Sequence, residues 1–142
     1  MIAGPIDMNN GMFDLRQGHT TRVDKSQPVP STLVAEGART LITYSGVTIM
    51  PDIPEFYRKY PPLLEFLSAQ KMPWKESRTL AGEIGEYIVM MRETDEAYLV
   101  GVATNDQERT VDVPLTFIGT GPWMPPLLKM AMEHTILRTG NV

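Results

Sequence analysis

The clearest structural signal in the sequence is the stretch Tyr87-Ile88-Val89-Met90-Met91-Arg92-Glu93-Thr94-Asp95-Glu96-Ala97-Tyr98-Leu99-Val100-Gly101-Val102-Ala103. Two runs rich in β-branched and aromatic residues, 87–91 and 98–103, flank the polar segment 93–96. This pattern predicts an antiparallel β-hairpin with a four-residue loop. Further along, apolar and polar residues alternate over 110–117, which is typical of a half-buried strand. Pro114 favours an edge or bulged position for that strand, because proline has no N–H to donate.

The residues before this hairpin have a helical period. One helix is predicted from about Thr32 to Tyr44, with Ser31 or Thr32 as its cap. A second helical region lies between Pro54 and Gln70 and is interrupted by two prolines, so we expect it to restart at Pro62. Its residues predicted to pack inward are Leu63, Leu64, Phe66 and Leu67. Helices followed by an antiparallel, β-sandwich-like meander predict the α+β fold class.

Composition excludes several classes of protein. The chain has 142 residues, 13 basic against 17 acidic side chains and a net charge of −4 without a basic block, which argues against nucleic acid as a partner. It has no cysteine, so disulfides, cysteine-based zinc sites and a thiol nucleophile are excluded. No apolar run reaches the length of a membrane span, and no signal peptide is visible, so a membrane partner is not expected and the localisation is left open.

Few residues have the surroundings of a functional site. Asp7 lies in a glycine-, proline- and asparagine-rich segment, where it is either a site residue or a turn aspartate that bonds its own backbone. Trp74 and Glu76 combine an aromatic ring with an acid, which suits a sugar-binding platform, although such a tryptophan more often serves interfacial packing. His19 and His134 lack the neighbours of a metal motif, so no metal ligand is predicted.

Three stretches resemble the C-terminal portion of glycoside hydrolase family 97, which contains bacterial α-glucosidases and α-galactosidases. The first is similar to the family's A-G-P-M-D-Y segment near the end of its (β/α)8 barrel and reads Ala3-Gly4-Pro5-Ile6-Asp7-Met8. The second is similar to S-P-L-Q-M-L-A-D-x-P and reads Ser45-Gly46-Val47-Thr48-Ile49-Met50-Pro51-Asp52-Ile53-Pro54. The third resembles P-T-x-W-D-E-T-x-x-L-x-G-x-x-G-E-Y and runs from Pro73 to Tyr87. The similarity covers about residues 1–121.

The resemblance implies three segments. Residues 1–70 would be the end of a barrel, residues 71–118 part of a C-terminal antiparallel β domain, and residues 119–142 a divergent tail. The tail reads as a helix over 123–134, and its codons, read in a shifted frame, fit the family pattern W-D-A-x-x-x-x-D-G. We therefore hypothesise a frameshift at or just after Trp123. Without the rest of a barrel, the apolar faces of the helices in 32–70 are expected to be exposed and to promote self-association.

The resemblance also limits the chemistry. The family's catalytic glutamates and calcium ligands lie upstream of the first matching stretch, so no catalytic residue, metal ligand or cofactor is expected in this chain. Asp7, Trp74 and Glu76 remain as candidate substrate-binding residues. Two functions are left open: a truncated C-terminal region of a family 97 enzyme that serves packing or homo-oligomerisation, and a stand-alone module that binds carbohydrate through Trp74 or Trp123, or binds another protein.

The 142-residue chain is expected to hydrolyse neither aryl α-glucosides nor aryl α-galactosides, with or without calcium. The reason is that glycoside hydrolysis needs two carboxylates at a fixed separation, and the sequence offers only Asp7 near the expected place. A chromogenic assay with the purified chain measures this. Turnover that disappears in Asp7→Asn would contradict the prediction.

Overall fold

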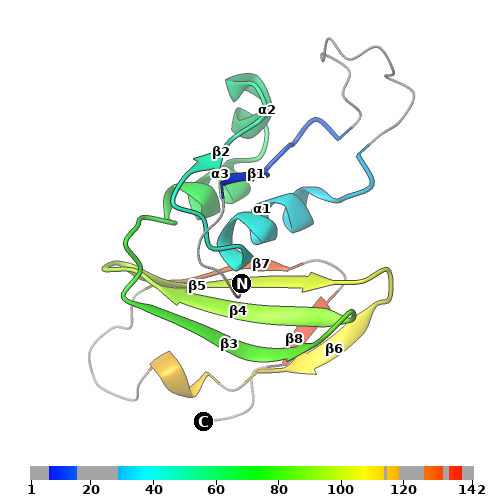
Figure 1. Cartoon of the computed structure of the whole chain (residues 1–142), viewed down its shortest axis with the longest axis vertical. Helices are drawn as coiled ribbons and strands as arrows, with labels where there is room; N and C mark the ends of the chain where they lie inside the picture. The colour runs from blue at the N-terminus through cyan, green and yellow to red at the C-terminus, as the bar shows by residue number, and fades with distance from the viewer. Residues whose placement is uncertain (1–6, 16–28, 114, 119–126, 133–134, 139–142) are drawn as a thin grey trace.

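A computed structural model describes residues 7–15, 29–113, 115–118, 127–132 and 135–138 of the chain (Figure 1). Its helices are α1 (Leu33–Ile42), α2 (Pro54–Arg58), α3 (Pro61–Ser68) and the short 3-10 helix η1 (Thr116–Ile118). Its strands are β1 (Met8–Asn9), β2 (Thr48–Ile49), β3 (Glu76–Glu83), β4 (Tyr87–Glu93), β5 (Ala97–Thr104), β6 (Arg109–Asp112), β7 (Leu127–Met132) and β8 (Thr135–Arg138). The predicted α+β class is confirmed.

The predicted hairpin forms the centre of a four-stranded sheet with the order β3-β4-β5-β7. Strands β4 and β5 pair antiparallel, with Tyr87 opposite Thr104 and Glu93 opposite Tyr98. The turn between them is held by Thr94, whose hydroxyl oxygen accepts the N–H of Ala97 at 3.0 Å. Strand β3 adds antiparallel to β4, so residues 76–104 are the expected meander.

The outer strands differ from the prediction. Strand β7 pairs parallel with β5, and β6 pairs parallel with β8, so the β region is not wholly antiparallel. The helix predicted over 123–134 is wrong at residues 127–132, which are β7, and its other residues lie outside the described part of the chain. The predicted strand over 110–117 is also too long. Strand β6 ends at Asp112, two residues before Pro114, and residues 116–118 are helical.

The helices begin and end close to the predicted places. Thr32 is the cap of α1, because its hydroxyl oxygen accepts the N–H of Ala35 at 3.2 Å. The second helical region divides into α2 and α3, and α3 restarts at Pro61, one residue before the predicted position. Of the residues predicted to pack inward on α3, Phe66 is buried, Leu63 and Leu67 are half-buried, and Leu64 is 38% exposed. Leu64 lies two positions from Phe66, on the other side of the helix.

Strands β1 and β2 pair parallel and are connected through α1, which makes a short β-α-β unit. Met8 lies opposite Thr48, and the N–H of Met8 donates to the carbonyl of Val47. A unit of this kind is the building block of a (β/α)8 barrel. The assignment of residues 1–70 to the end of a barrel stays a prediction.

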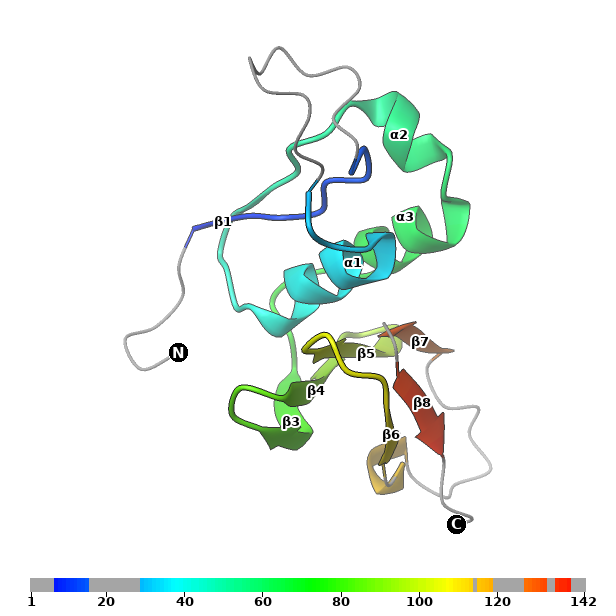
Figure 2. The same cartoon turned by 90° about the vertical axis from the view of Figure 1, so that its right-hand side faces the viewer.

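The helices cover one face of the four-stranded sheet (Figure 2). A core forms between them and β5 and consists of Ala38, Leu41, Phe66, Ala97 and Leu99. The expectation that the apolar faces of these helices are exposed is therefore wrong for α1, whose Ala38 and Leu41 are fully buried. The opposite face of the sheet carries a second core, formed by Val89, Met91, Val100, Val102, Val111 and Val113. The last two of these residues belong to β6 and the residue after it.

Gly101 lies where α1 comes closest to the sheet. A Cβ atom at this position would lie 3.1 Å from the carbonyl oxygen of Ala38 and 3.2 Å from a methyl carbon of Leu41. We expect Gly101→Val to lower the free energy of unfolding by about 2 kcal/mol, because overpacking pushes α1 away from β5. Urea unfolding followed by circular dichroism measures the change.

The matched control for Gly101→Val is Gly46→Val. A Cβ atom at Gly46 has no heavy atom within 4 Å, so its effect on stability should stay within about 0.5 kcal/mol. Equal effects of the two substitutions would contradict the role given to Gly101.

Candidate functional site

Trp74, a candidate sugar platform, lies in the segment between α3 and β3. Its indole is half-buried and packs against the core under α1. The guanidinium carbon of Arg92 lies 4.4 Å from the centre of the ring system, and the ring of Tyr44 lies 5.6 Å away at 59°. These contacts are those of an interfacial packing residue, which was the alternative to sugar binding. A sugar-binding role for Trp74 stays a prediction.

Arg92 is a central residue of this region that sequence reasoning missed. It is a buried arginine on β4, and its guanidinium donates to the carbonyl oxygens of Leu41 at 3.2 Å and Ile42 at 3.1 Å. These carbonyls belong to the last turn of α1, where backbone acceptors have no partner within the helix. Burial lowers the pKa of Arg92 below its ordinary value. The only signal in the sequence was a charged residue directly after the apolar run 87–91.

Glu76 is the first residue of β3 and is half-buried. Its carboxylate accepts hydrogen bonds from Arg78, so the side chain already has a cationic partner. Close by, a cavity of about 220 Å³ is lined by residues 71–75 and 94–96. Its rim carries two exposed ion pairs, Lys71 with Glu96 at 2.8 Å and Lys75 with Asp95 at 2.9 Å. The hydrogen bond from Lys75 to Asp95 raises the pKa of the lysine.

Asp7 lies on a different element, directly before β1, and its side chain is exposed. Glu76 thus begins β3 and Trp74 lies two residues before it, whereas Asp7 lies directly before the β-α-β unit. Site roles for Asp7, Trp74 and Glu76 remain predictions.

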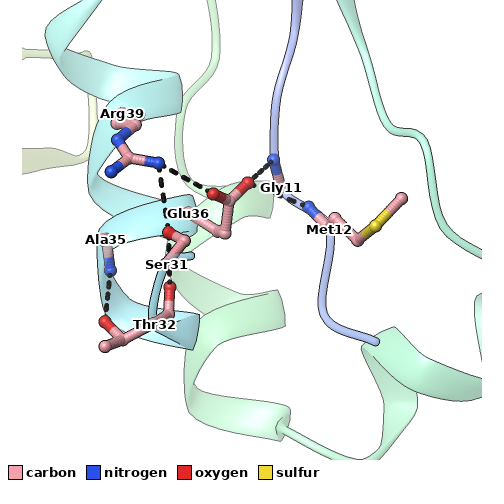
Figure 3. A network of polar contacts seen from close by, with 7 residues as sticks. All are labelled: Gly11, Met12, Ser31, Thr32, Ala35, Glu36 and Arg39. Atoms are coloured by element: carbon pink, nitrogen blue, oxygen red, sulfur yellow. Dashed lines mark hydrogen bonds and ion pairs between the residues drawn. The ribbon is translucent and has the colours of Figure 1, made fainter. Parts of the chain in front are cut away.

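The segment that follows β1 is held by a buried carboxylate on α1. Glu36 accepts the backbone N–H groups of Gly11 at 3.1 Å and Met12 at 3.2 Å (Figure 3). Its other oxygen pairs with Arg39 at 2.9 Å, and Arg39 also donates to Ser31. A carboxylate that receives two backbone donors and a guanidinium is well satisfied despite its burial. Glu36 therefore positions the segment that follows β1, and both of its carboxylate oxygens are engaged in these contacts.

A second carboxylate holds the next two residues of the same segment. Asp52 accepts the N–H groups of Phe13 at 2.8 Å and Asp14 at 2.6 Å, and its own N–H donates to the hydroxyl of Tyr57. The ring of Phe13 packs on that of Tyr57 at 5.0 Å. Burial raises the pKa of Tyr57. Residues 11–14 are thus fixed to α1 and to the residues before α2.

The described residues contain neither a metal-binding cluster nor a membrane-spanning helix. Nowhere in the described ranges do three or more histidine, aspartate or glutamate side chains gather as a metal site would need. None of the helices described is long and apolar enough to cross a bilayer.

A larger cavity, of about 560 Å³, lies at the outer end of the meander. It is lined by Thr79, by residues 82–88 and by residues 103–105, and its lining is mostly apolar. Beside it, Ile84 projects from the turn between β3 and β4 with 103% of its reference surface exposed. Sequence reasoning did not single out this residue, because an isoleucine beside a glycine in a turn has no periodic pattern to mark it.

The region that contains this cavity matches a known protein family. Residues 73–125 match the model of the glycosyl-hydrolase 97 C-terminal domain, which is described as an oligomerisation domain. This part of the chain is thus similar to the C-terminal domain of glycoside hydrolase family 97. The match includes β3 to β6 and η1, so the prediction of a family 97 C-terminal region is confirmed.

Two relatives extend the similarity beyond the domain. A retaining alpha-galactosidase of Bacteroides thetaiotaomicron is 26% identical over 129 residues, which cover 90% of this chain. A probable retaining alpha-galactosidase of Streptomyces bingchenggensis is 26% identical over 145 residues, which cover 99% of this chain. The chain spans about a fifth of the length of each relative. The second alignment continues past Trp123, and the frameshift hypothesis stays untested.

The contacts of Arg92 with Leu41, Ile42 and Trp74 form a joint between the helices and the sheet. A substitution of Arg92 tests this joint. We expect Arg92→Met to lower the free energy of unfolding by about 2–4 kcal/mol, because two buried carbonyls lose their donor and Trp74 loses its cation. Urea unfolding of Arg92→Met and of the unmodified chain measures this difference in the free energy of unfolding.

The matched control for Arg92→Met is Arg78→Met, which removes an arginine from β3 whose side chain is 49% exposed. Exposed ion pairs contribute little, so the loss should stay below about 1 kcal/mol. A neutral Arg92→Met would show that the last turn of α1 does not depend on this side chain.

Proposed function

We propose that the chain is a self-association region of a family 97 glycoside hydrolase and that its own role is structural. The observation that carries the proposal is the match of residues 73–125 to a domain described as an oligomerisation domain. The packing of the described residues supports the same role, because Trp74, Glu36 and Asp52 are each engaged in internal contacts. Both relatives are named as retaining alpha-galactosidases, which favours an α-galactoside as the substrate of the enzyme that carries such a region.

The proposal requires a homo-oligomer. Among the described residues, two surfaces expose apolar side chains that suit a contact between copies. One is the outer end of the meander around Ile84. The other is at β2, where Ile49 is 56% exposed and Val47, directly before the strand, is 59% exposed. Where exposed apolar side chains form a patch, the patch usually marks a contact with another protein segment.

Sedimentation velocity of the purified chain tests the proposal directly. We expect one defined species at an integral multiple of the monomer mass, with a fraction that falls on dilution as mass action requires. Light scattering at the same concentrations distinguishes a defined oligomer from open-ended aggregates. A chain that stays monomeric at the highest soluble concentration would contradict self-association.

A further inference from the structure

Three residues at the outer end of the meander form a row across the sheet. Gly82 of β3 lies opposite Ile88 of β4, which lies opposite Ala103 of β5. Directly opposed residues point to the same face of a sheet, so these three share one face. The neighbours of Ile88 in this row are a glycine and an alanine. Their side chains are absent or small, so the surface of the sheet is low on both sides of Ile88. The cavity of about 560 Å³ lies over this row, and we name it the hairpin groove.

The helices leave this end of the sheet uncovered. Gly101 lies two residues before Ala103 on β5 and faces Ala38, Leu41 and Ile42 of α1. Residues two apart on a strand point to the same face, so the hairpin groove continues the face that α1 covers. The opposite face is already filled by the core that includes Val111 and Val113. The groove is thus a part of this face that the described helices do not cover.

The turn beside the groove presents an apolar side chain. The N–H of Glu86 donates to the carbonyl of Glu83 at 3.0 Å and closes the turn. Gly85 has a φ of +82°, a conformation that side-chain-bearing residues rarely adopt. This geometry leaves Ile84 wholly exposed, although turns favour small or polar residues.

Contacts from the neighbouring turn hold the backbone of the turn that carries Ile84. The N–H of Asn105 donates to the carbonyl of Glu86 at 2.8 Å. Arg109 pairs with the Glu86 carboxylate at 2.8 Å and with the side-chain oxygen of Asn105 at 2.7 Å. A side chain presented on a turn fixed in this way loses little conformational freedom when it binds, which favours association.

We infer that the hairpin groove and Ile84 form the interface between two copies of this chain, with Ile84 of each copy entering the groove of the other. The inference rests on the proposed self-association and names its surface. Each residue that lines the groove lies within 73–125, the range matched to an oligomerisation domain. A knob and a groove on the same surface make that surface self-complementary, as a twofold contact requires.

The free edge of β3 is a poorer alternative for the same contact. Strand β3 carries a register shift between Thr79 and Ala81, which inserts Leu80 as an extra residue. Such bulges twist an edge strand and hinder its pairing with another chain. The contact therefore forms through side chains at the end of the sheet, not through an extended ladder.

The first experiment compares Ile84→Asp with Val47→Asp by sedimentation equilibrium. We expect Ile84→Asp to weaken self-association roughly 100-fold or more, because a twofold contact loses two buried isoleucines. Val47→Asp places the same charge on the exposed surface near β2 and should leave the association unchanged. Circular dichroism confirms folding, which Ile84→Asp should not affect because the side chain contacts solvent.

The results separate the inference from the proposed function. A monomeric unmodified chain would overturn both. An oligomer that survives Ile84→Asp, whether or not Val47→Asp disrupts it, would overturn only the inference.

A second experiment measures the contact itself. The chain has no cysteine, so Glu83→Cys and Val47→Cys each introduce one unique site for a spin label, and both leave Ile84 in place. Glu83 is exposed at the groove, so across a twofold groove contact the distance between two labels at position 83 should be clearly shorter than between two labels at position 47. The reverse order would place the interface at β2 and overturn the inference.

Discussion

The close approach of α1 to β5 at Gly101 is the contact on which the rest of the structure depends. The carbonyl oxygen of Ala38 and the side chain of Leu41 occupy the space where another residue would have its Cβ atom. Leu41 thereby reaches Leu99 and Phe66 and completes the core between the helices and the sheet. The helical half of the chain is thus joined to the β region by a packed interior, and not only by the connection between α3 and β3.

The close approach of α1 to the sheet makes hydrogen-bond donors necessary, and Arg92 provides them. When the last turn of α1 lies on the sheet, the carbonyls of Leu41 and Ile42 are removed from water and need donors from elsewhere. A guanidinium on β4 supplies two N–H groups to them and lies over the ring of Trp74. The contacts of Trp74 with Arg92 belong to this joint, and a sugar-binding role for Trp74 stays a prediction.

Local patterns predicted the parts of the fold that local interactions determine. The hairpin of β4 and β5, the cap at Thr32 and the proline break before α3 each follow from a few neighbouring residues. The strand β7 could not be found in this way. Its sequence, Leu127-Leu128-Lys129-Met130-Ala131-Met132, consists of good helix formers, and it becomes a strand because the edge of β5 offers a ladder.

Long-range packing also determined what the sequence could not show about the candidate site. The exposure of the α1 face was predicted wrongly because its partner, Gly101, lies about sixty residues away and carries no apolar side chain to mark it. Arg92 was missed for a similar reason, since its acceptors are backbone carbonyls, which no sequence motif records. Ile84 became notable only when its exposure and the fixed geometry of its turn were known.

The joint and the hairpin groove lie on the same face of the sheet but share no residue. Along β4, Arg92 belongs to the joint and Ile88 to the groove. Four residues separate them, or about 13 Å of extended strand. The sheet is rigid between them because β4 pairs along its whole length with β3 and β5. The attachment of the helices and the proposed contact between copies therefore use different side chains of one strand. A second copy seated on the groove would leave the attachment of the helices to the sheet intact, as an assembly region within a longer enzyme requires.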